Sequence, residues 1–181
     1  MLENCDNAQE RWGGVNDIID TWLDSRRALI VRFCSLSKNL VSLGYANSRE
    51  HQTGLDLSEI KETISLGPDN QHALSFELPS FCQRLIDYTS AAHFEVYVQL
   101  LAEAHAFQDQ NALDYGKTLM EQIHPLTQSC VDFSDKYAQS FNTYDLVYDL
   151  DALGMRLESR FELEDAMISN LHTVHRALAI N

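Results

Sequence analysis

Apolar residues recur along this chain at intervals of three and four, the period of a helix that buries one face. One series runs from Val15 to about Leu43, and another from about Tyr144 to Ala179. The second series consists of Leu150, Leu153, Leu157, Phe161, Ile168, Leu171, Val174 and Leu178. No segment alternates convincingly with period two, and no Asn-Gly or Asp-Gly pair predicts a hairpin. We therefore expect an all-α protein.

Two further long helices are expected between these series. The first begins near Phe76 and extends toward residue 107, either unbroken or interrupted where Ser90 caps a new helix. The second starts at Asp109 or Asn111 and contains Pro125, which predicts a kink. Together the patterns predict an up-and-down bundle of four long helices with one or two additional short helices.

Residues 44–75 have the composition of a connection, with several glycines and a run of Asn, Ser, His and Gln. We expect a flexible inserted connection here, within one domain that covers residues 1–181. One of the short helices is expected near residues 3–12.

The charge balance narrows the class of partner. Thirteen Lys and Arg residues stand against 27 Asp and Glu residues, which gives a net charge of −14. Direct binding of nucleic acid requires a basic surface, so we expect none. An acidic surface instead favours encounter with a basic protein, although acidity also serves solubility alone. No apolar stretch reaches the roughly 18 residues of a membrane span, and the acidic first ten residues do not resemble a signal peptide. We expect a cytoplasmic protein without a membrane segment.

Metal-binding and catalytic patterns are sparse. Glu121 and His124 have the ExxH spacing of carboxylate-bridged metal sites, but no second ExxH lies on a long helix. There is no phosphate-binding glycine motif and no recognisable nucleophile–base pair. We expect no metal, no cofactor and no enzymatic activity. The four cysteines form no CxxC pair and are expected to be small buried hydrophobes: Cys5, Cys34, Cys82 and Cys130.

The segment FCQRLIDYTSAAHFEVY, residues 81–97, carries the densest chemistry. Asp87, Ser90, Phe94 and Tyr97 follow intervals of three, four and three, so we expect them to share one helix face. A face with an acid, a hydroxyl and aromatic rings suits the binding of a protein better than catalysis. His93 lies within the segment and lacks a recognised acid or nucleophile partner, so we interpret it as a structural polar residue that is hydrogen-bonded within the bundle.

Two other polar positions fall in apolar series. Glu164 interrupts the last series, where a carboxylate is costly unless it is paired. Arg160 lies one turn earlier and is the expected partner in a buried cross-link, the alternative being that Glu164 turns toward solvent. Trp22 is in register with the core, yet with Arg26 one turn later it also has the composition of an interface hot spot. Both interpretations of Trp22 stay open.

Four segments in this order resemble the Rsd/AlgQ family of bacterial anti-sigma factors, nearer the AlgQ branch. They are MLENCDNAQERWGGV at the start, WLDSR at 22–26, DYTSAAHF at 87–94 and RFELED at 160–165. The chain departs from the family pattern at Ala92, where glycine is usual, and over residues 44–75.

The resemblance implies a helical bundle that binds domain four of the primary sigma factor. Covering this domain would block its contacts with the −35 promoter element and with core RNA polymerase. The implied partner-binding residues are Asp87, Ser90 and Phe94, with Trp22, Arg26 and Tyr97 as further candidates, whereas Arg160 and Glu164 would order the bundle. The alternatives are a metal-binding bundle of the ferritin or hemerythrin type and an adaptor for another basic cytoplasmic protein.

Overall fold

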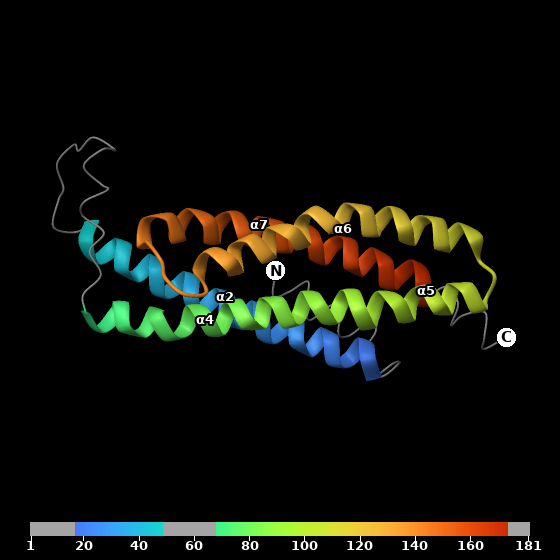
Figure 1. Ribbon diagram of the computed structural model, residues 1–181, viewed down its shortest axis with the longest axis horizontal. Coiled ribbons are helices and arrows are strands. Elements are labelled where there is room, and N and C mark those ends of the chain that lie inside the picture. Colours follow the sequence, from blue (N-terminus) through green and yellow to red (C-terminus); the bar gives the residue numbers. More distant parts are fainter. Residues whose placement is uncertain (1–16, 49–67, 174–181) are drawn as a thin grey trace.

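The computed structural model describes residues 17–48 and 68–173, and these form four long antiparallel helical segments (Figure 1). The first is α2 (Asp17–Ser48). The second joins α4 (Pro68–Ala91), the π-helical turn η1 (Ala92–Val96) and α5 (Tyr97–Ala106) into one continuous rod. The third is α6 (Gln110–Tyr137), and the fourth is α7 (Thr143–Ile168) with the π turn η2 (Ser169–Thr173). The described residues contain no strand, and the predicted all-α, up-and-down bundle is confirmed.

Capping residues explain where two of these helices begin. The side chain of Asp109 accepts a hydrogen bond from the Ala112 amide at 2.9 Å, and Asn142 accepts one from the Tyr144 amide at 2.9 Å. Such caps satisfy amides that have no partner inside the helix. The predicted start at Asp109 or Asn111 is therefore confirmed. Ser90 caps no new helix, because the chain stays helical from Pro68 to Ala106.

The connection between the first two long helices is shorter than the predicted 44–75. The helix α2 continues to Ser48 and α4 already begins at Pro68, a residue that suits the first turn of a helix. Leu74 and Leu78 are buried and extend the apolar series of α4 toward its start. The polar residues of this region made the start of the apolar series difficult to recognise from the sequence. Residues 49–67 and the short helix predicted near 3–12 lie outside the described residues.

The core lies between the four segments and contains the predicted apolar series of α7 as far as Leu171. The helices α2 and α7 approach closely at Gly154, where a Cβ atom would lie 2.7 Å from the Phe33 ring. Cys82 and Cys130 are buried as predicted, whereas Cys34 is exposed. Burial raises the pKa of both buried thiols to about 11. Within the described ranges, no helix combines the length and the apolar character that crossing a membrane requires.

Candidate functional site

A buried carboxylate joins α2, the rod and α7. Glu164 is fully buried, and its Oε1 accepts hydrogen bonds from Arg160 Nε at 2.7 Å and from the Tyr97 hydroxyl at 2.9 Å. Its Oε2 accepts hydrogen bonds from Arg26 Nη2 at 3.0 Å and from the Tyr88 hydroxyl. We call Glu164 and these four donors the Glu164 hub. The buried cross-link between Arg160 and Glu164 is thus the one that the sequence predicted.

The two positive charges of the hub are balanced by Glu164 and by the partly exposed Asp165. Arg26 Nη1 lies 2.5 Å from Asp165 Oδ1, so two guanidinium groups face two carboxylates. Burial alone would lower the pKa of Arg26, but Tyr88, Glu164 and Asp165 raise it above its ordinary value, so the guanidinium stays charged. Burial raises the pKa of Tyr88 and Tyr97 well above that of a free phenol, so both remain neutral donors.

The hub corrects three predicted partner contacts. Trp22, Arg26 and Tyr97 are 2%, 1% and 1% exposed, so their side chains face the core and not a partner. Trp22 stacks on the ring of Tyr88, and the Arg26 guanidinium lies 4.9 Å from the ring centroids of both Trp22 and Phe161. The core interpretation of Trp22 is the one that the structure supports.

Asp87 does not share the predicted common face with Ser90, Phe94 and Tyr97. Asp87 lines a groove between α2 and the rod, which we call the α2 groove. Ser90, Phe94 and Tyr97 line a second groove between the rod and α6, the α6 groove, although the side chain of Tyr97 is only 1% exposed. The separation falls between Asp87 and Ser90, which both precede η1 in α4, so a spacing of three residues is enough to place them in different grooves.

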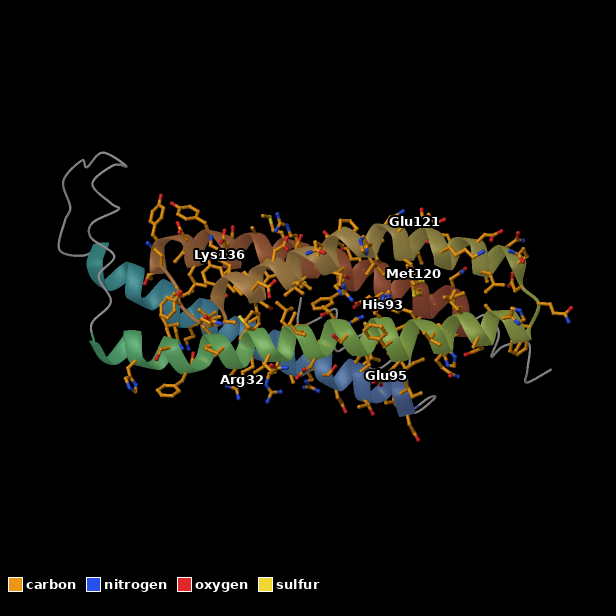
Figure 2. All side chains as sticks on the ribbon, viewed as in Figure 1. Arg32, His93, Glu95, Met120, Glu121 and Lys136 are labelled. Carbon is orange, nitrogen blue, oxygen red and sulfur yellow. The ribbon has the colours of Figure 1, made fainter. Side chains whose placement is uncertain are left out.

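His93 also differs from its predicted role. It is exposed, and its ring contacts those of Phe94 and Tyr97 at centroid distances of 5.1 and 6.3 Å. It is therefore not a hydrogen-bonded residue of the bundle interior. Figure 2 shows His93 on the side of η1 that faces α6, and Glu95 on the side that faces α2.

Exposed apolar and acidic side chains gather around η1. Phe94 is 73% exposed and Val98 is 59% exposed, and Ile18 of α2 is exposed across the α2 groove. Asp87 and Glu95 are exposed beside them. We call these five residues the docking surface. Ile18, Glu95 and Val98 were not among the partner-binding residues expected from the sequence.

The ExxH pair does not form part of a larger cluster in the described ranges. Glu121 and His124 are both exposed on α6. No group of three His, Cys, Asp or Glu side chains suited to a metal ion occurs among the described residues. The geometry around η1 therefore offers a surface for contact with another molecule, and it offers no assembled set of metal ligands.

Comparisons with known proteins agree on one family. The family model described as regulator of RNA polymerase sigma(70) subunit, Rsd/AlgQ, matches residues 1–62 and 55–172. The protein is 30% identical over 172 residues to the "Regulator of sigma D" of Salmonella paratyphi B, covering 93% of this chain and 90% of that protein. It is 28% identical over 178 residues to the protein of the same name from Yersinia pseudotuberculosis, covering 93% and 87%. The chain belongs to the Rsd/AlgQ family.

Proposed function

We propose that this protein is an anti-sigma factor that binds domain four of the primary sigma factor and hides its contacts with the −35 element and core RNA polymerase. Membership of the Rsd/AlgQ family and the names of its relatives support a sigma-regulating role. The observation that carries the proposal is the docking surface, where the exposed Phe94 lines the α6 groove and the acidic Asp87 and Glu95 line the α2 groove of the same rod.

The chemistry of this surface suits a DNA-reading module. Such a module must be basic, because it neutralises phosphates when it places its recognition helix in the groove of DNA. Asp87 and Glu95 supply negative charge on the side of the α2 groove, within a chain of net charge −14. A protein bound here would occupy the basic face that DNA needs, so regulation would follow from occlusion.

Three of the partner-binding residues expected from the sequence would make direct contact. Asp87 would pair with a basic side chain, although one of its oxygens already accepts a hydrogen bond from Gln83 at 2.7 Å. Phe94 would fill an apolar notch, as buried aromatic anchors do in interface hot spots. The small, half-buried side chain of Ser90 would let the partner approach the α6 groove. Trp22, Arg26 and Tyr97 would contribute indirectly, because they are buried and support the helices that carry these contacts.

The activity we propose is stoichiometric binding, with no bond made or broken and no cofactor. A helical adaptor for a different basic protein would use the same surface, so the experiment must distinguish the two partners.

The deciding experiment is a calorimetric titration of the purified protein with isolated sigma domain four at low ionic strength. A −35 promoter duplex is then added in competition. We expect a one-to-one complex that promoter DNA displaces, because both ligands need the same face of domain four. Absence of a complex would refute the proposal, and a ternary complex with DNA would refute occlusion of the −35 contact. A second competition experiment adds core RNA polymerase in place of DNA. It tests whether the protein also hides the contact of domain four with the polymerase.

A further inference from the structure

Tyr88 and Tyr97 lie on one continuous rod, and both donate a hydrogen bond to the carboxylate of Glu164. They are separated by nine positions, which equals about two and a half turns of an α-helix with 3.6 residues per turn. An uninterrupted α-helix would therefore point the two side chains in nearly opposite directions. One carboxylate could not then accept a hydrogen bond from both hydroxyls.

The π turn η1 removes this conflict. The Tyr97 amide donates to the Ala92 carbonyl, five residues earlier, so this turn holds about one residue more than an α-helical turn. One additional residue changes the direction of everything after it by about 100° relative to the residues before it. Tyr97 is thereby brought toward the side of the rod on which Tyr88 lies. Ala92 and Val96, at the two ends of the turn, are fully buried against the bundle.

The same turn changes the relative directions of the residues of the docking surface. Asp87 and Phe94 are seven positions apart, about two turns, and would share a stripe on an uninterrupted α-helix. Instead Asp87 and Glu95 line the α2 groove, and Phe94 lines the α6 groove. The π turn thus sets the direction of the aromatic side chain relative to the acidic one.

We propose that Glu164 is a positioning residue whose bonds to Tyr88 and Tyr97 hold the π turn and so fix the placement of Phe94 and Glu95 that the basic partner recognises. This inference rests on the proposed function. Glu164 does not touch the partner and acts through the two tyrosines.

Each tyrosine hydroxyl is fixed by a second hydrogen bond. Arg26 Nε donates to the Tyr88 hydroxyl at 3.1 Å, and Arg160 Nη2 donates to the Tyr97 hydroxyl at 3.1 Å. A π turn is rare and persists where the surrounding structure determines it from several sides. Here one carboxylate and two guanidinium groups hold the residues on both sides of η1 in place.

The test removes the two hydroxyls and leaves the rings. The variant combines Tyr88→Phe with Tyr97→Phe, and Glu164 keeps both arginine partners. The matched control is Tyr137→Phe, at the C-terminal end of α6. This change removes the hydrogen bond that the buried Tyr137 donates to Asp149 Oδ2 at 2.6 Å. Backbone amide exchange over residues 92–98 and affinity for isolated sigma domain four are measured for all three proteins. Should the double variant fail to fold, Tyr97→Phe alone takes its place.

We expect amide exchange over residues 92–98 to become at least about tenfold faster in the double variant, while the amides of α6 keep their protection. Affinity for domain four should fall by about tenfold or more, and the control should keep both properties. Unchanged amide protection at η1 would show that the two hydroxyls do not hold the turn. Unchanged affinity would show that the turn does not shape the surface that the partner recognises. Either result would overturn the proposal. If the unaltered protein does not bind domain four, the proposed function and the docking role fail together. The exchange measurement still decides whether the hydroxyls hold the turn.

Discussion

The indole ring of Trp22 lies flat against the phenol ring of Tyr88, with ring centroids 5.4 Å apart and ring planes 3° from parallel. This stack joins α2 to the rod directly beneath the α2 groove, which both residues help to line. Trp22 and Arg26 of the WLDSR segment therefore belong to the interior of the bundle, although together they have the composition of an interface hot spot. Its effect on binding would be indirect.

Trp22→Ala should mainly destabilise the fold. Removing a large, buried aromatic side chain leaves a cavity and typically costs about 3–5 kcal/mol of unfolding free energy. Urea denaturation measures this loss. Thr21→Ala is the control, because Thr21 is the exposed neighbour and should change stability by no more than about 0.5 kcal/mol. If Trp22→Ala kept its stability and lost only binding, the side chain would have to be reassigned to the interface.

Phe94→Ala should weaken binding and spare the fold. Phe94 is 73% exposed, so its removal should leave the melting temperature nearly unchanged while affinity for domain four falls by about 1–3 kcal/mol. Phe76→Ala is a matched control, because this phenylalanine is 69% exposed on the same rod but far from η1. Calorimetry and thermal melting compare the two variants. Equal affinities for domain four would remove Phe94 from the interface.

Neutralising the acids of the α2 groove should weaken binding through charge. The variant Asp87→Asn with Glu95→Gln keeps the side-chain shapes, so affinity should fall at low salt and its dependence on salt concentration should become shallower. Glu121→Gln is the control, since Glu121 lies on α6, across the bundle from Glu95 in the view of Figure 2. A salt dependence that stays the same in the double variant would contradict the electrostatic role of these acids.

The sequence could predict the bundle and the pairing of Arg160 with Glu164, because both depend on local helical spacing. It could not predict that Arg26, Tyr88 and Tyr97 complete the hub, since these residues lie 67 to 138 positions away from Glu164 along the chain. The directions of Phe94 and Glu95 relative to Asp87 could not be predicted from the sequence either. A π turn changes the helical period by one residue, and nothing in the apolar spacing of residues 81–97 marks where it occurs.

The hydroxyl of Tyr137 should make stability depend on alkaline pH. Burial raises the pKa of Tyr137 to about 12, and its hydrogen bond to Asp149 acts in the same direction. A group whose pKa is higher in the folded state stabilises the protein fully below its unfolded pKa of about 10. That contribution to stability is lost progressively as the pH rises from the unfolded pKa of about 10 through the folded pKa of about 12. Urea denaturation between pH 8 and pH 12 should therefore show a constant gap in unfolding free energy between the unaltered protein and Tyr137→Phe up to about pH 10, and a narrowing gap above it. A gap that stays constant to pH 12 would show that this phenol ionises equally easily in the folded and unfolded chains.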